Sequence, residues 1–454
     1  MFIIIALYLF RLIKNNKCKM KKIYLILSTL VLSILSCETE TELVEIPDSI
    51  IKSIADEAAA SAATAAANAV ASTVTEAATT AIDNAFDEQA SEQASSVNDD
   101  PLPPSEYEFT RNGISTVFYT GQTDRLKMAG ELHSAFSDTS KSEADILAMF
   151  NEGTGFSDTS LNSSGKNVGG KTAKSNYAST TVKPQIQAFI SRVVNDVFPF
   201  YNNDASEGVA GKYTDPDGRT VRIDGKGFEM NQIFTKSLMG ALVTDQIINS
   251  YLWRGKLDAG TNIANNDNLV FEYESSGATT NNVTKMEHYW DEGFGYLYGQ
   301  DNQYSHEVGN GVLVSKYLAK GDVPGLDAII YDAFKLGRAA IIAGDYELKD
   351  KQAKIIKTSI SKVIGYRASS YLRSGASNVD VRWADAFHAL SEGYGFVLSL
   401  QFTMNDDGEP YFTNTEVNQM LADLEKDNGF WSRTAAELNA MADKIDAVTG
   451  LSTL

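Results

Sequence analysis

The sequence predicts an all-α protein built from two related helical bundles, with long loops and one small β-hairpin. Apolar residues recur at three- and four-residue spacing through most of the chain beyond residue 140, which is the periodicity of amphipathic helices. A short motif occurs twice at an offset of 100 residues, which indicates an internal duplication. The turn sequence Asp215-Pro-Asp-Gly218 lies between two short strand-forming runs and predicts the hairpin.

The N-terminal segment has the features of a bacterial lipoprotein leader. Lys21 and Lys22 precede an apolar run that ends at Ser36-Cys37, and this run is short for a membrane span. We therefore interpret residues 1–19 as an upstream extension, residues 20–36 as the signal peptide and Cys37 as the lipidated first residue of the mature protein. The alternative is that the N-terminus itself is a membrane anchor.

Residues 37–106 are predicted to form a tether between the acylated cysteine and the folded domain. The segment is rich in Ala, Ser and Thr and has few large apolar side chains to bury. A coiled-coil stalk is the alternative, although large residues are sparse at its core positions. The acidic residues Glu38, Glu40 and Glu42 resemble the export tag of Bacteroidota lipoproteins. We expect anchoring to the outer membrane, on the cell surface or on the periplasmic face.

Charge and cysteine content exclude several classes of function. The formal net charge is −20, and the basic leader would be removed, so the mature surface repels phosphate backbones. Nucleic acid is therefore not an expected partner. The only cysteines are Cys18 and Cys37. The mature domain therefore has no cysteine for a disulfide, a thiolate nucleophile or a Cys-ligated zinc.

The folded domain is predicted to span residues 107–454, with a first half of about 107–310 and a second half of about 311–454. Polar insertions at 157–174 and 260–282 are predicted to be long loops, which are often functional. The predicted helical ranges are Ile146–Phe150, Ile186–Val197, Met230–Trp253, Leu326–Ala343, Gln352–Leu372, Trp383–Phe402, Thr415–Leu424 and Ala435–Val448.

The repeated motif reads His-x3-Glu-Gly-aromatic-Gly-aromatic. It begins at His288 in the first copy and at His388 in the second, and only two other histidines occur in the chain. Residues at positions 0, +4 and +7 share one helix face, so His and Glu lie one turn apart and can share a metal ion or a proton. Four glycines are expected to permit close packing against a helix or a ligand: Gly293, Gly295, Gly393 and Gly395.

The functional hypothesis is that both copies face one shared cavity. The residues that would converge there are His288, Asp291, Glu292, His388 and Glu392. Imidazole and carboxylate ligands in this mixture suit iron or zinc. The alternative is that each His donates a hydrogen bond to its own Glu or to a neighbouring helix, as buried polar groups commonly do.

Several strings resemble a Bacteroidota lipoprotein family catalogued as domain of unknown function 4856. They are Tyr107–Leu126, Leu161–Lys166, Met230–Phe234 and the first motif copy at His288–Tyr296. This resemblance covers most of residues 107–454 and implies no activity.

The architecture also resembles imelysin-type proteins, which are duplicated helical lipoproteins associated with iron uptake and once classed as peptidases. Their motif is Gly-x-His-x-x-Glu, and only the histidines carry over, to His288 and His388. At the +3 position Asp291 stands in the first copy and Ser391 in the second, while Glu lies at +4 in both. This departure puts the metal geometry and the peptidase activity in doubt.

These observations favour an envelope-anchored, non-enzymatic binding protein that handles iron or another metal, with an outer-membrane uptake receptor as a partner. No phosphate loop, dinucleotide fingerprint, zincin motif or nucleophile elbow is present in the sequence. The alternatives are an imelysin-like metallopeptidase with Glu as general base, and a surface adhesion or scaffold module with no small-molecule site.

Overall fold

The computed structural model describes residues 101–174, 180–309, 313–321 and 323–451. These residues belong to one compact unit, Asn98–Leu454. The predicted leader, the lipidation site Cys37 and almost all of the predicted tether lie outside the described residues. Within the described part, no helix is both long enough and apolar enough to cross a membrane.

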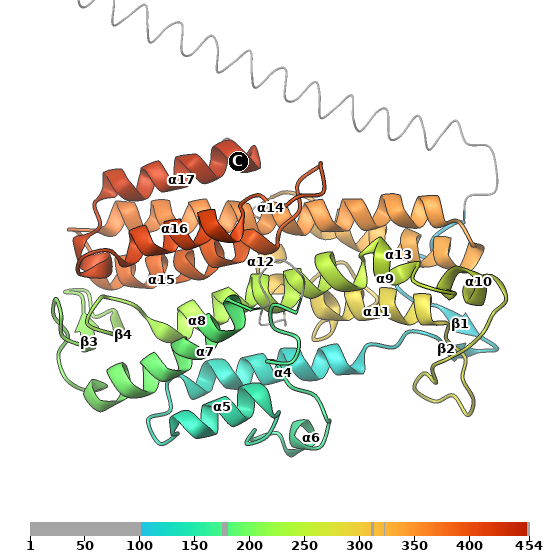
Figure 1. The fold of residues 1–454 in the computed structure, drawn as a ribbon, viewed down its shortest axis with the longest axis horizontal. Helices are drawn as coiled ribbons and strands as arrows, with labels where there is room; N and C mark the ends of the chain where they lie inside the picture. Colours follow the sequence, from blue (N-terminus) through green and yellow to red (C-terminus); the bar gives the residue numbers. More distant parts are fainter. Residues whose placement is uncertain (1–100, 175–179, 310–312, 322, 452–454) are drawn as a thin grey trace, which may run out of the picture. The chain divides into compact units, whose positions relative to one another are not determined.

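The compact unit is all-α, as predicted (Figure 1). Its α-helices are α4 (Thr120–Ala135), α5 (Glu143–Asn151), α6 (Thr159–Asn162), α7 (Val182–Arg192), α8 (Met230–Leu238), α9 (Arg254–Leu257), α10 (Asn262–Asp267), α11 (Lys285–Tyr298), α12 (Val314–Leu318), α13 (Leu326–Ala343), α14 (Tyr346–Asn378), α15 (Trp383–Ser399), α16 (Asn414–Glu425) and α17 (Ala435–Thr449). The π-helical segments are η1 (Val193–Val197), η3 (Met239–Thr244) and η4 (Ile247–Tyr251), and the 3-10 segments are η2 (Phe198–Phe200), η5 (Leu400–Phe402) and η6 (Gly429–Ser432).

Two antiparallel strand pairs are the only sheets among the described residues. The predicted hairpin is present, with β3 (Gly211–Thr214) paired to β4 (Thr220–Ile223). A second pair, which was not predicted from the sequence, joins β1 (Thr110–Arg111) to β2 (Ile114–Ser115). The two predicted long loops are largely irregular, but each contains one short helix, α6 or α10.

The long helix α14 organises the second half of the domain. It packs against α13, α15 and α17, and α15 also packs against α8 (Figure 1). The segments α8, η3 and η4 follow one another as one nearly continuous helix. This helix contacts α15 through α8 and η3, and it contacts α11 through η4, so it touches both motif helices. Its two π-helical stretches lie where it passes from α15 to α11, and such stretches often occur near functional sites.

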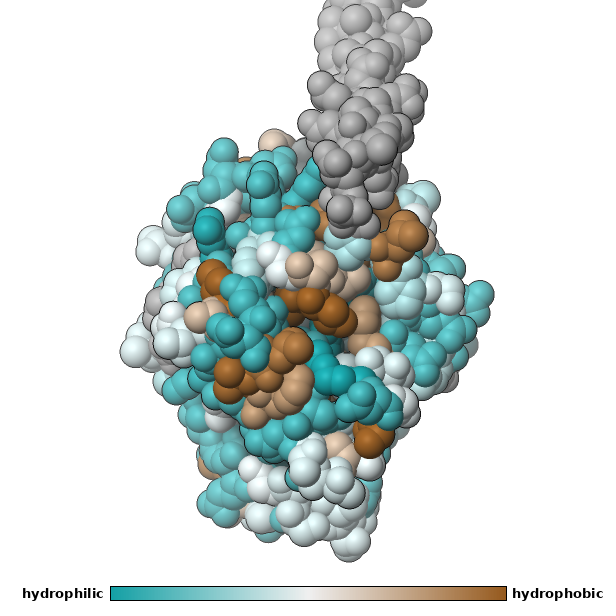
Figure 2. Space-filling view, turned by 90° about the vertical axis from the view of Figure 1, so that its right-hand side faces the viewer, coloured by the Kyte–Doolittle hydropathy of each residue, from teal (hydrophilic) through white to brown (hydrophobic). Residues whose placement is uncertain are grey.

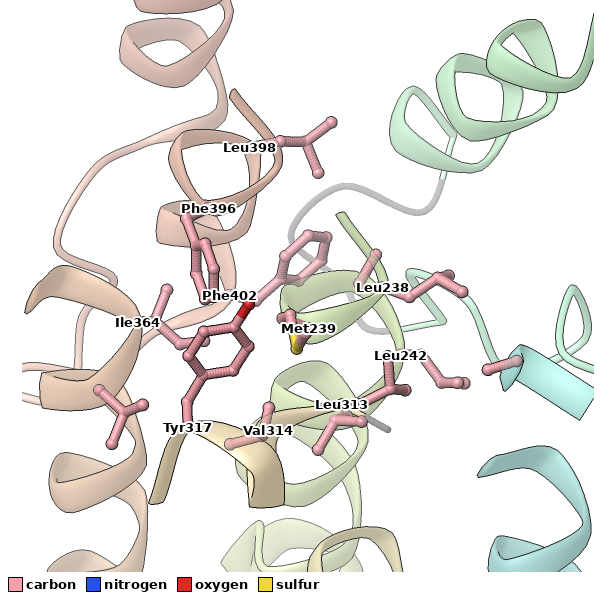
Figure 3. Close-up of a cluster of buried hydrophobic side chains, with 14 of the residues drawn as sticks. Leu238, Met239, Leu242, Leu313, Val314, Tyr317, Ile364, Phe396, Leu398 and Phe402 are labelled. Carbon is pink, nitrogen blue, oxygen red and sulfur yellow. The ribbon is translucent and has the colours of Figure 1, made fainter. Parts of the chain in front are cut away.

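A hydrophobic cluster lies where side chains of α12 meet side chains of α14, α15 and η3 (Figure 3). Its labelled members are Leu238, Met239, Leu242, Leu313, Val314, Tyr317, Ile364, Phe396, Leu398 and Phe402. The cluster therefore fixes the relative positions of the elements that carry the second motif copy.

On the surface, the hydrophobic side chains at the end of the molecule shown in Figure 2 lie among hydrophilic ones.

Candidate functional site

The two motif copies lie on helices with the same internal geometry. Thr284 and Glu287 form a capping box that begins α11, and the first copy follows directly. The distance from His288 Nε2 to Glu292 Oε2 is 3.7 Å, and the distance from His388 Nε2 to Glu392 Oε2 is also 3.7 Å. In each copy, therefore, the imidazole and the carboxylate face one another across one helical turn.

The two copies do not form the shared metal cluster that the sequence predicted. The helix α11 packs mainly on α4, α13 and η4, whereas α15 packs mainly on α8, α14 and α16. Among the described residues, no group of three or more His, Cys, Asp or Glu side chains is arranged to hold a metal ion. We conclude that the sequence spacing identified two equivalent helix turns, each with its own partners.

Asp291 belongs to a buried ion network rather than to the His288–Glu292 pair. Its Oδ1 accepts hydrogen bonds from the Tyr107 hydroxyl at 2.6 Å and from Arg338 Nε at 3.1 Å, and Arg338 also pairs with Glu287 at 2.8 Å. Burial raises the pKa of Asp291 to about 6, although Arg338 acts in the opposite direction. Asp291 therefore anchors the N-terminal segment of the domain to α11.

The +3 positions of the two motifs make the same kind of contact. Asp291 Oδ2 accepts a hydrogen bond from the backbone N–H of Phe118, just before α4, at 3.3 Å. Ser391 Oγ accepts one from the backbone N–H of Glu229, just before α8, at 2.8 Å. The segments that begin α4 and α8 are therefore equivalent partners of the two motif helices, which supports the predicted internal duplication.

The motif glycines divide into two pairs. A Cβ on Gly295 would overlap the side chain of Tyr119, and a Cβ on Gly395 would overlap Lys236. A Cβ on Gly293 would lie 3.2 Å from a Leu252 methyl group, and one on Gly393 would lie 3.4 Å from Tyr371 Cβ. Only Gly295 and Gly395 are thus at positions where the approach of the neighbouring chain requires glycine.

In the first copy, His288 and Glu292 line a pocket of about 210 Å³. Its other lining residues come from the start of α4 and from the predicted loop at 157–174: Phe118, Tyr119, Thr120, Gly121, Gln122, Arg125, Lys166 and Lys171. The imidazole of His288 lies between Phe118, with ring centroids 5.0 Å apart, and Tyr273, at 4.1 Å. Burial lowers the pKa of His288, which favours the neutral ring.

The pocket is positively charged although the protein is acidic. Arg125, Lys166 and Lys171 face a single carboxylate, that of Glu292. Tyr119, the N-cap residue of α4, makes no side-chain capping bond, and Thr120 and Gly121, the first residues of this 16-residue helix, line the same pocket. Cationic side chains and free helix N–H groups together favour an anion.

In the second copy the corresponding pair is closed by protein groups. Lys236 Nζ lies 3.1 Å from Glu392 Oε1, and the Tyr317 hydroxyl donates to the same oxygen at 3.4 Å. His388 Nδ1 lies 2.7 Å from Glu229 Oε2. Burial would raise the pKa of Glu392, but Lys236 and His388 together lower it below its usual value. Side chains of the protein thus supply the hydrogen-bond and ion-pair partners of His388 and Glu392.

The sequence reasoning missed the residues that give the pocket its charge. Arg125, Lys166 and Lys171 lie outside the motif, and Gln122 is an ordinary residue of the first helical turn. One signal was present, because Lys166 and Lys171 lie within the long polar insertion predicted to be a loop. No sequence pattern showed that this loop approaches His288.

Comparison with known families gives one match. Residues 104–452 match the family described as domain of unknown function DUF4856. The chain belongs to this family. No curated protein and no solved structure matches it. The family assignment extends over both motif copies and the pocket, and it brings no activity with it.

Proposed function

We propose that this protein is an envelope-anchored, non-enzymatic binding protein that holds a small anionic ligand in the pocket beside His288 and Glu292. The observation that carries the proposal is the concentration of Arg125, Lys166 and Lys171 around a cavity in a chain of net charge −20. A cavity that gathers cations against the overall charge favours a ligand of opposite sign.

The pocket has groups available for such a ligand. Arg125 is held in place by backbone carbonyls, with Nε donating to Asn167 at 3.1 Å and Nη1 to Gly121 at 3.0 Å. Lys166 makes no ion pair within the described part of the chain, so its ammonium group is available to a ligand. Lys171 Nζ donates to the Tyr251 hydroxyl at 2.8 Å and extends the positive wall.

The experiment is a calorimetric titration of the full-length protein in detergent with inorganic phosphate and with acetate at low ionic strength. We expect saturable binding of at least one anion, and a loss of tenfold or more in the Lys166→Ala, Lys171→Ala double variant. The exposed Lys127, also on α4 but outside the pocket, provides the matched control Lys127→Ala. The proposal would be rejected if neither anion bound, or if Lys127→Ala lost as much affinity as the double variant.

Anchoring through Cys37 to the outer membrane and a role beside an uptake receptor remain part of the proposal. Support for them comes from the leader pattern and the acidic segment that follows it. No donor cluster among the described residues favours the metallopeptidase alternative. The scaffold alternative predicts that neither anion binds, so the same titration separates it from the binding protein.

A further inference from the structure

The glutamates of the two motif copies differ in one partner. Glu392 Oε1 has the ammonium group of Lys236 at 3.1 Å, and Lys236 and Glu392 are only 5% and 7% exposed. The second copy therefore contains a complete, buried carboxylate–ammonium pair. Such a pair is stable only when both charges are present, since either one alone would be buried without compensation.

Glu292 has neutral partners where Glu392 has a cation. Its Oε1 accepts hydrogen bonds from the Gln122 amide at 2.9 Å and from the Tyr251 hydroxyl at 3.1 Å. Within the described ranges its one ion-pair partner is His288, at 3.7 Å. Lys171 and Lys256 lie near enough to interact with the charge of Glu292, but neither forms an ion pair with it. Lys171 donates to the Tyr251 hydroxyl, and Lys256 lies over the Tyr251 ring, 3.8 Å from the centroid.

Glu292 also lines the pocket, so a bound anion would lie close to its carboxylate. Two like charges at such a distance repel one another, and this repulsion opposes the attraction from the lysines. A ligand that brings its own ammonium group removes the conflict, because that group can take the role that Lys236 has beside Glu392.

We propose that the ligand is a zwitterion, a small free α-amino acid, whose ammonium group pairs with Glu292 and whose carboxylate is held by Lys166 and the first N–H groups of α4. This inference rests on the proposed anion-binding function. The pocket has a volume of about 210 Å³. That space suits a small amino acid and lies below the range of about 300–1,000 Å³ usual for drug-sized ligands.

The test compares ligands that differ only in the charged groups. The full-length protein is titrated with glycine, alanine and serine, with acetate, propionate and 3-hydroxypropionate, and with methylamine, ethylamine and 2-aminoethanol. At least one amino acid should bind ten times or more tightly than both its deaminated acid and its amine. If the acids bind and the ammonium group adds nothing, the zwitterion inference is overturned while the anion-binding function stands. If no acid or amino acid binds, both fall.

Matched variants locate the effect. Glu292→Gln should abolish the tenfold preference for the amino acid over its deaminated acid, whereas the double variant Lys236→Met, Glu392→Gln, which removes both buried charges of the second copy, should keep it. Gln122→Lys should also abolish the preference, because it brings an ammonium group to Glu292, as Lys236 does to Glu392 in the second copy. This variant keeps Glu292, so it tests the inference even if Glu292→Gln fails to fold. A preference unchanged in Gln122→Lys would count against the assignment.

Discussion

The first and second motif copies share the same helix geometry, but their glutamates have different partners. In both, a His and a Glu face one another at 3.7 Å, and the +3 side chain accepts a hydrogen bond from the segment that begins the neighbouring helix. In the second copy Lys236 neutralises the glutamate inside the protein, whereas the first copy opens on a basic pocket. The comparison shows that a repeated motif can mark equivalent packing without marking equivalent sites.

The difference extends to the +3 residue itself. Ser391 makes its contact with a neutral hydroxyl, but Asp291 brings a charge into a fully buried position. That charge needs Arg338, which is itself 0% exposed, and Arg338 also holds Glu287. At the +3 position, therefore, the first copy is stabilised by a buried ion network and the second copy by a neutral hydrogen bond.

The largest expected effect follows from this contrast. Arg338→Met should lower the free energy of unfolding by about 3–5 kcal/mol, because Glu287 and Asp291 would stay buried without their cation. Urea-induced unfolding followed by circular dichroism measures the change. Adding Asp291→Ser, which copies Ser391, should recover part of the loss by removing one of the buried carboxylates.

Arg254→Met is the control for that prediction. Its side chain is 77% exposed and pairs with Asp258 at 3.2 Å on the surface, so its removal should cost less than about 1 kcal/mol. If the two arginine variants lost equal stability, the buried network would not be the feature that distinguishes the first copy.

The glycine pairs provide a second test of equivalence. Gly295→Ala and Gly395→Ala should each lose about 1–3 kcal/mol, because the added methyl group overlaps Tyr119 or Lys236. Gly393→Ala should gain up to about 1 kcal/mol from its higher helix propensity, since its Cβ meets only ordinary contacts. Thermal unfolding of the separate variants measures these changes. A loss in one copy without a loss in the other would show that the two copies do not pack equivalently.

Much of the fold could be predicted from periodicity alone. The range Leu326–Ala343 is α13, and Trp383–Phe402 is α15 with η5, because their apolar spacing continues to the residues where the helices end. The hairpin followed from its turn sequence. The β1–β2 pair has only two residues in each strand, too few for an alternating pattern to appear.

The site could be predicted only in part. Sequence spacing places His288 and Glu292 on one helix face, and the structure agrees. It cannot show which loop lies opposite them, so Lys166 and Lys171 were missed. It also assigned Asp291 to the same group as His288, but Arg338 and Tyr107 bind Asp291 in a buried network, and Asp291 does not line the pocket. The role of Asp291 depends on residues that are distant in the sequence, and the spacing of residues along one helix does not predict which of them lie close to it.

The smallest expected effect concerns the enclosure of the first copy's histidine. The side chain of His288 is 11% exposed, whereas the side chain of His388 is 29% exposed and touches Glu229. Burial lowers the pKa of His288, so between that pKa and about 6.5 the unfolded state binds a proton that the folded state does not. Stability should therefore fall as the pH drops below about 6.5.

His288→Gln should remove this contribution, so its stability should decline less than that of the unaltered protein between pH 7.5 and pH 5. Urea-unfolding curves collected across this range measure the difference, and the value at pH 7.5 gives the packing cost of the substitution separately. His133, whose pKa is also lowered by burial, is present in both proteins and cancels in the comparison. Identical pH profiles would mean that the enclosure of His288 by Phe118 and Tyr273 does not hold its ring neutral.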